Sequence, residues 1–121
     1  MILTIDTTDD INVRVCLEGE GENRCIERPA ARAQGEELLP VIDDLLKKSK
    51  LKLKDIRGIK VANEGGSFTS LRIGVATANA LAFALGVPGS DKNGKCLEKD
   101  ELKIVEPIYD REPEIGGKSQ K

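Results

Sequence analysis

The sequence has 121 residues, of which 39% are hydrophobic and only 2% aromatic, so a single domain with a core of Ile, Leu, Val and Ala is expected. Charged residues make up 33% of the chain, but the net charge is only −2. This balance gives no overall attraction to nucleic acid or to an anionic membrane.

Histidine is absent, which excludes Ser-His-Asp and Cys-His nucleophilic sites and zinc sites that contain histidine. The three cysteines, Cys16, Cys25 and Cys96, have no CxxC spacing. An odd number of cysteines without a targeting segment indicates reduced thiols in a cytoplasmic protein. The longest apolar run, residues 71–87, carries polar side chains and is too short for a convincing membrane span.

The first third of the chain predicts three strands, at residues 2–6, 11–17 and 24–28, separated by polar turns. The second of them alternates apolar and polar side chains, as a half-buried strand does. We therefore expect an antiparallel meander. Cys16 and Cys25 would be cross-strand neighbours in it, with structural thiols as the default interpretation.

A helix is predicted within ARAQGEELLPVIDDLLKKSK, residues 31–50, because its leucines recur at helical spacing. If the helix begins near Glu36 or Glu37, Pro40 falls in its first turn, whereas an earlier start predicts a kink. A basic connector follows, and residues 56–61 then predict a buried strand.

The stretch GGSFTSLRIGVATANALAFALG, residues 65–86, predicts a glycine turn and a helix that is apolar on nearly every face. Ser67 or Thr69 suits the N-cap, and Gly86 suits the residue after the last turn. A helix without a polar face needs a sheet on one side and another partner on the other. It is therefore either core or an interface.

The last part of the chain is polar and rich in turns. It predicts a weak helix at residues 97–102, an edge strand at residues 104–109 and a disordered end.

Two loops are candidate ligand sites. The glycine loop at the helix N-terminus could bind an anion, but a tight turn is the favoured interpretation, because no Walker A lysine follows and Glu64 would repel phosphate. Asp6, Asp9 and Asp10 could hold a hard cation, although a solvated turn is the simpler interpretation. No catalytic, cofactor-binding or metal-binding residue is predicted. The loop residues singled out are Gly65, Gly66, Ser67, Phe68 and Thr69.

The order strand, strand, strand, helix, strand, glycine loop, helix resembles the first half of the actin-like ATPase fold, a ribonuclease H-like α/β fold with a mixed sheet and two main helices. Three segments resemble the TsaB (YeaZ) family, the non-catalytic paralogue of the TsaD (Gcp) family: MILTIDTT, ARAQGEELLPVIDDLL and GGSFTSLRIGVATANALAFALGVP. The tail VEPIYDREP resembles the Pro-x-Tyr-x-Arg-x-Pro pattern at the end of that family.

The sequence departs from the family pattern in three places. Glu64-Gly65-Gly66 stands where Gly-Pro-Gly is usual, and Ser70 stands where the family has glycine. Only a polar connector separates Pro88 from the tail, where the family has a second domain. We therefore expect a family-like first domain over residues 1–88, followed over residues 89–121 by a shortened connector and a partly disordered tail. The turn after residue 6 takes the place of the first phosphate loop of this fold but lacks its glycines.

The resemblance implies a role in making N6-threonylcarbamoyladenosine (t6A) at position 37 of tRNAs that read codons beginning with A. TsaD carries the metal and transfers the threonylcarbamoyl group, TsaB pairs with it through two helices, and TsaE joins as an ATPase. The chain is therefore expected to be a scaffold with no cofactor, in indirect contact with tRNA, and a homodimer when alone. The residues expected at the helical interface are Leu38, Leu39, Ile42, Leu46, Arg72, Ile73, Val75, Ala76, Ala78, Asn79, Ala80 and Phe83.

Several alternatives stay open. The leucines of the first helix either join this interface or pack inward. The chain could instead be a small ATPase or glycoprotease-like hydrolase, or a degenerate self-associating remnant. The cluster Lys47, Lys48, Lys50, Lys52 and Lys54 is either a solvated helix end or a contact for tRNA phosphates.

Overall fold

The computed structural model describes residues 1–99 and 102–108. The chain begins with three antiparallel strands. They are β1 (Ile2–Asp6), β2 (Asn12–Gly19) and β3 (Glu22–Pro29). β1 pairs with β2 and β2 with β3, both antiparallel, so the predicted meander is confirmed. Ile11, which the alternation assigned to the buried face, is 61% exposed, because β2 begins only at the next residue.

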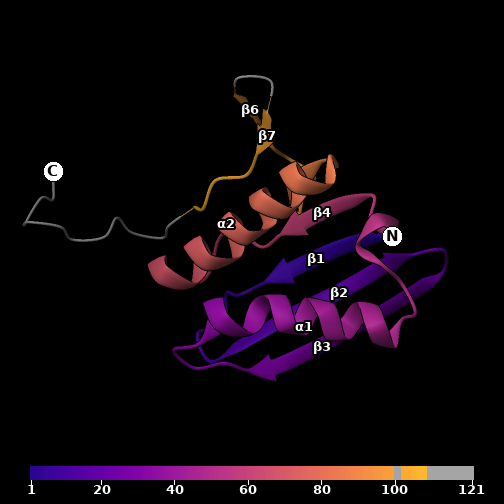
Figure 1. Cartoon of the computed structure of the whole chain (residues 1–121). Helices are drawn as coiled ribbons and strands as arrows, with labels where there is room; N and C mark the ends of the chain where they lie inside the picture. Colours follow the sequence, from indigo (N-terminus) through magenta and orange to yellow (C-terminus); the bar gives the residue numbers. More distant parts are fainter. Residues whose placement is uncertain (100–101, 109–121) are drawn as a thin grey trace, which may run out of the picture.

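Two parallel strands complete the sheet. β4 (Gly58–Val61) pairs with β1 beside β2 and β3 (Figure 1). β5 (Gly89–Asp91) pairs with β4, which gives the order β3-β2-β1-β4-β5. β5 was not predicted, because Gly, Ser and Asp are poor strand formers. These three residues form a strand because the free edge of β4 offers them backbone partners.

Both helices lie on one face of the sheet, α1 (Gln34–Lys48) over β2 and β3 and α2 (Phe68–Leu85) over β4 and β1 (Figure 1). The chain crosses from β3 to β4 and then from β4 to β5 in the same direction. Right-handed crossovers therefore place both helices on the same side. The core lies between this face and the helices, and its largest fully buried side chains include Leu3, Ile5, Leu17, Leu38, Leu45, Ile59 and Leu71.

Helix α1 buries one apolar stripe, which consists of Leu38, Val41, Ile42, Leu45 and Leu46. The leucine spacing also places Leu39 on this stripe, but Leu39 is 55% exposed. The helix begins at Gln34, earlier than a start near Glu36, so Pro40 lies beyond the first turn. The proline removes the helical donor to the Glu36 carbonyl. Both residues are exposed, so water can satisfy that carbonyl.

The ends of α2 match the sequence prediction. Ser67 is the N-cap and its Oγ accepts a hydrogen bond from the Ser70 N–H at 3.2 Å. Gly86 ends the helix in the left-handed conformation, with φ at 67°, which glycine adopts without strain. Of the two predicted N-caps, Ser67 and Thr69, the structure uses Ser67, and the predicted end at Gly86 is confirmed.

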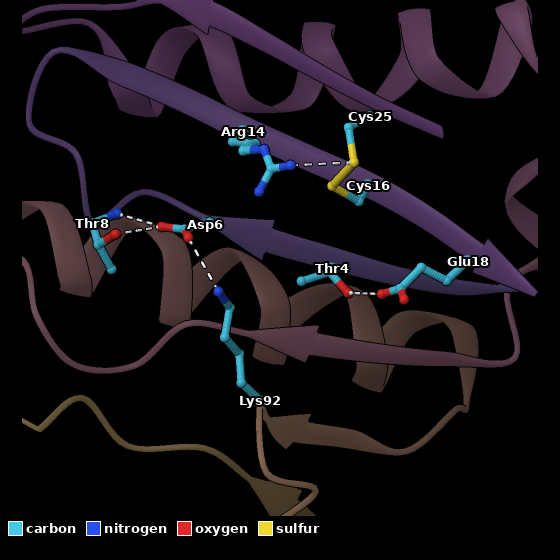
Figure 2. A network of polar contacts seen from close by, with 8 residues as sticks. All are labelled: Thr4, Asp6, Thr8, Arg14, Cys16, Glu18, Cys25 and Lys92. Carbon is cyan, nitrogen blue, oxygen red and sulfur yellow. Dashed lines mark hydrogen bonds and ion pairs between the residues drawn. A yellow bond between two sulfur atoms is a disulfide. The ribbon is translucent and has the colours of Figure 1, made fainter. Parts of the chain in front are cut away.

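The opposite face of the sheet carries polar side chains (Figure 2), and neither α1 nor α2 packs on it (Figure 1). The Thr4 hydroxyl on β1 donates a hydrogen bond to the Glu18 carboxylate on β2. Cys16 on β2 lies directly opposite Cys25 on β3, and their Cα atoms are 4.0 Å apart. The two cysteines form a disulfide, so the expectation of reduced thiols is wrong for this pair. The antiparallel register brings them together, which cysteine spacing alone did not reveal. Cys96 is free and exposed.

The segment after β5 forms a two-stranded hairpin, β6 (Leu97–Lys99) and β7 (Leu102–Ile104), so the predicted weak helix there is wrong. The hairpin continues into an extended strip, residues 104–108, which meets the loop after β4 in an isolated parallel bridge between Glu64 and Ile108. The edge strand expected at residues 104–109 is thus reduced to this bridge. The end predicted to be disordered lies outside the described residues.

We predict that the Cys16–Cys25 disulfide stabilises the meander. Replacing Cys25→Ser removes a cross-link that closes a loop of nine residues in sequence separation. The loss of this constraint on the unfolded chain should lower the free energy of unfolding by about 3 kcal/mol. Urea denaturation with and without reductant measures the effect, and Cys96→Ser is the matched control that should change little. Three reduced thiols in the untreated protein would contradict the prediction.

Candidate functional site

The glycine loop packs against the chain's own β1–β2 turn. A Cβ atom on Gly66 would lie 2.8 Å from the Thr8 Cα, and a Cβ on Gly74 would collide with the Thr7 hydroxyl. Both glycines therefore allow the first turns of α2 to approach this turn more closely than any side chain permits. Close packing inside the fold gives the loop glycines a structural role.

A buried polar cluster joins the same turn to the N-termini of both helices. Ser70 Oγ lies 2.8 Å from Asp10 Oδ1 and 2.7 Å from Gln34 Oε1, so one hydroxyl hydrogen serves two acceptors. The Gln34 amide donates to the carbonyls of Thr7, Asp9 and Asn12, and the Thr7 hydroxyl donates to the Ser70 carbonyl at 2.6 Å. Sequence reasoning missed this cluster. Its signal was a polar residue at the buried start of each helix.

The three aspartates of the turn have separate partners. The Ser70 hydroxyl, followed by that of Ser67, holds the pKa of Asp10 below its ordinary value. Burial raises the pKa of Asp6, but hydrogen bonds from Thr8 and the charge of Lys92 outweigh it and lower that pKa (Figure 2). Asp9 accepts from the backbone and side chain of its neighbours. Within residues 1–99 and 102–108, no group of three or more Cys, Asp or Glu side chains is placed to hold a metal.

The side of α2 that points away from the sheet is exposed and mostly apolar, with one charged side chain. It carries Arg72, Ala76, Ala80 and Phe83, and the Phe83 side chain is 72% exposed. We call these four residues the outer face of α2. The Arg72 guanidinium lies 5.3 Å from the centre of the Phe68 ring, which places a cation beside an aromatic surface at the start of this face.

Helix α1 contributes Leu39, which is 55% exposed, to the same surface. Glu37 and Asp44 of α1 pair with Arg28 on β3, so that flank of the helix faces the outer strand. At 100° per residue, Leu39 lies on the opposite flank and therefore faces α2. Ile73 of α2 is half-buried and packs against the core.

The structure divides the residues expected at the interface into three groups. Leu39 and the outer face of α2 are exposed, and Ile73 and Asn79 are half-buried. The remaining five belong to the core, with exposed fractions of 4% or less: Leu38, Ile42, Leu46, Val75 and Ala78. The leucine stripe of α1 is therefore packed inward, apart from Leu39.

The other flank of α2 is covered by the strip of residues 104–108. The Asn79 side chain donates to the Val105 carbonyl at 2.8 Å and accepts from the Val105 N–H at 2.9 Å. The side-chain amide of Asn63, two residues after β4, donates to the Glu106 carbonyl at 2.8 Å. The backbone carbonyl of Asn63 accepts from the Ile108 N–H at 2.6 Å. Two asparagines thus hold the strip through its backbone, and Val105 is 4% exposed.

Two hollows border this strip. One of about 550 Å³ lies between the strip and the segment after β5, where Asn63, Asp91 and Cys96 line it. A smaller one of about 250 Å³ lies between α2 and Pro107, next to Arg72 and Ala76. Residues of the strip and of the outer face of α2 line the same small hollow, so the two surfaces lie side by side.

Helix α2 also has the length and composition of a membrane span, with a mean hydropathy of 1.3 over 18 residues. One such helix is weak evidence, because core helices of soluble proteins pass the same test. Leu71, Ala78 and Ala82 of this helix are buried within the fold.

We predict that Ser70→Ala lowers the free energy of unfolding by about 1–3 kcal/mol, because it leaves the buried acceptor of Gln34 without its donor. The variant should also alter the response to acid. A lowered folded-state pKa means that Asp10 stabilises the protein above its ordinary pKa of 3.8, and that this stabilisation is lost as the pH falls through the folded-state value.

Without Ser70, the pKa of Asp10 should return towards its ordinary value, so less stability is lost below about pH 4. Urea denaturation at neutral pH and at a series of acidic pH values measures both effects. Thr69→Ala, at the exposed neighbouring position, is the control and should behave as the wild type does. An unchanged acid response in Ser70→Ala would contradict the assignment.

Comparison with known proteins gives consistent matches. The family model described as "TsaD: tRNA N6-adenosine threonylcarbamoyltransferase" matches residues 27–90. The chain is 33% identical over 87 residues to the tRNA threonylcarbamoyladenosine biosynthesis protein TsaB of Haemophilus influenzae, covering 72% of this chain and 36% of that protein. It is also 44% identical over 59 residues to the tRNA N6-adenosine threonylcarbamoyltransferase of Rhodopirellula baltica, covering 49% of this chain and 16% of that protein.

Among solved structures, YeaZ from Pseudomonas aeruginosa superposes with a TM-score of 0.70 at 30% identity. The match covers 74% of this chain and 42% of that one. The chain spans a little over a third of the length of the TsaB relative from Haemophilus influenzae. The shared sheet order and helices are those of the actin-like, ribonuclease H-like fold. The chain belongs to the family that the TsaD model describes and, within it, to the TsaB (YeaZ) group.

Proposed function

We propose that this chain acts in t6A biosynthesis as a scaffold subunit, which docks on a TsaD-type catalytic subunit through the outer face of α2. The observation that supports the proposal most strongly is the exposed row of small and apolar side chains on a helix that is otherwise part of the core. The relatives whose names refer to this pathway share this helix, which lies within the matched residues 27–90.

The chemistry of the outer face suits a partner helix. Ala76 and Ala80 lie one turn apart and have short side chains, so a second helix can approach the α2 backbone closely. Phe83 and Leu39 then supply larger apolar surface, and burying each would contribute about 1.5–3 kcal/mol. A face of this kind usually marks an interface when it stays exposed.

The strip of residues 104–108 extends the proposed docking surface. Because Asn79 binds its backbone, Pro107 lies beside Arg72 and Ala76 at the smaller hollow. A partner on α2 would therefore contact the strip as well. In this proposal, a TsaE-type ATPase and the tRNA join through the TsaD-type subunit, and the same outer face pairs two copies of this chain when the partner is absent.

We predict that Ala80→Arg abolishes pairing with the TsaD-type subunit, because a long cation cannot be accommodated where two helices meet closely. Co-purification and titration of the two proteins should show affinity reduced at least a hundredfold. Circular dichroism and the melting temperature should remain unchanged, since position 80 is exposed. Ala78→Arg is unsuitable for this test because Ala78 is 2% exposed and faces the core.

Ala31→Arg, at an exposed turn between β3 and α1, is the matched control and should bind as the wild type does. Absence of any complex between the wild-type proteins at micromolar concentration would contradict the proposal. Growth of cells that lack the normal TsaB subunit, rescued by this chain but not by Ala80→Arg, would extend the test to the pathway. Saturable ATP hydrolysis by the pure chain would favour the enzymatic alternative instead.

A further inference from the structure

The positive charge of this chain is concentrated in one short segment. Residues 47–57 carry six Lys and Arg side chains and one acidic side chain, whereas the rest of the chain carries 13 basic and 20 acidic residues. A chain with a small negative total therefore contains a strongly basic surface. We call Lys48, Lys50, Lys52, Lys54 and Arg57 the basic edge.

The side chains of the basic edge have no ion pairs with the residues that the structure describes. All five are exposed. The ion pairs of the described residues are formed by other cations: Lys47 with Asp43, Arg28 with Asp44 and Glu37, Arg24 with Glu22, and Lys92 with Asp6. Asp55, the one acidic residue within the segment, accepts from the Lys52 N–H at 2.8 Å. Its carboxylate is therefore engaged by the backbone.

The backbone holds the basic edge in a defined shape. After α1, the Leu51 N–H donates to the Leu46 carbonyl at 2.9 Å, and Lys50 takes the left-handed conformation with φ at 57°. The short helix η1 (Leu53–Asp55) then leads to Ile56, which is 2% exposed and anchors the segment in the core. Lysines on such a segment lose less backbone entropy on binding than lysines on a flexible tail do.

A purely structural role explains only part of the cluster. Cations in the last turn of a helix interact favourably with its dipole, which accounts for Lys47 and Lys48 at the end of α1. This effect falls off within one turn. Lys52, Lys54 and Arg57 lie beyond that turn, and the dipole does not account for them.

We infer that the basic edge binds the phosphate backbone of RNA, and specifically of the tRNA on which the proposed complex acts. Residues 47–57 contain no aromatic side chain, so the contacts are expected to be with phosphates and not through base stacking. The choice of tRNA rests on the proposed function. The charge arrangement rests on the structure alone.

The position of the basic edge is compatible with simultaneous docking. It lies where β1 and β4 begin, next to the N-terminus of the chain, whereas the outer face runs along α2 from Arg72 to Phe83 (Figure 1). A partner on α2 would leave these lysines in water. The chain would then contribute a direct RNA contact in addition to its scaffold role.

The test uses the full chain and a fluorescein-labelled, unmodified tRNA transcript that reads a codon beginning with A. The variant Lys48→Gln/Lys52→Gln/Lys54→Gln removes three charges of the basic edge. The control Arg32→Gln/Lys60→Gln/Lys95→Gln removes three charges from elsewhere, none with an ion pair to a described residue. Both triple variants have the same net charge, and circular dichroism verifies their folding.

Wild type and control should bind the transcript with a steep salt dependence. The basic-edge variant should bind at least tenfold more weakly at 50 mM salt, and its slope of log affinity against log salt should be lower by about 2 to 3. Equal losses in both variants would overturn the inference, because binding would then follow net charge alone. Absence of wild-type binding, or lysine-dependent binding to anionic phosphatidylserine vesicles without binding to RNA, would overturn it as well.

Co-purification with the TsaD-type subunit separates this inference from the proposed function. The basic-edge variant should still form the complex, since none of its substitutions lies on α2. If the wild-type complex forms and RNA binding ignores the lysines, the basic edge is refuted and the scaffold proposal stands. If RNA binding depends on the lysines and no complex forms, the proposed function is refuted and the RNA surface stands.

Discussion

The contact between the start of α2 and the β1–β2 turn is the constraint on which the other features depend. Gly66 and Gly74 bring the helix backbone against Thr7 and Thr8, and the Ser70 hydroxyl links the turn to Gln34 of α1. These contacts fix the rotation of α2 about its axis. That rotation decides which of its many alanines face the sheet and which face outward, so a buried polar cluster sets the composition of the exposed face.

Elements that depend on a local sequence pattern could be predicted, whereas those that depend on pairing between distant strands could not. The alternation of apolar and polar side chains predicted β2, and the leucine spacing predicted α1. Candidate capping residues, which included Ser67 and Gly86, predicted the ends of α2. β5 is a strand only because β4 has a free edge, and the Cys16–Cys25 disulfide depends on the register between two strands. No pattern within residues 97–104 distinguished a hairpin from a weak helix.

In the candidate site, too, local sequence does not determine which residues of α2 are exposed. Ala78 and Ala80 are chemically identical and two positions apart, yet the first is buried and the second exposed. A helix that is apolar all round carries no amphipathic signal to separate them, so only its packing against the sheet does so. In the sequence, Ser70 is only a departure from a loop motif that has glycine at this position. The structure gives its hydroxyl two acceptors, the buried Gln34 side chain and the exposed Asp10 carboxylate.

The two sides of the sheet differ in what they need from solvent or from a partner. The side without helices is lined by groups such as Thr4, Arg14 and Glu18, whose hydrogen bonds and charges are compatible with water (Figure 2). The helical side exposes Phe83 and Leu39, which gain free energy when water is removed. Because α1 and the strip of residues 104–108 already cover the flanks of α2, its outer face is where a partner buries apolar surface with the least rearrangement of the chain. This difference between the two sides supports the proposal that a partner docks on the helices.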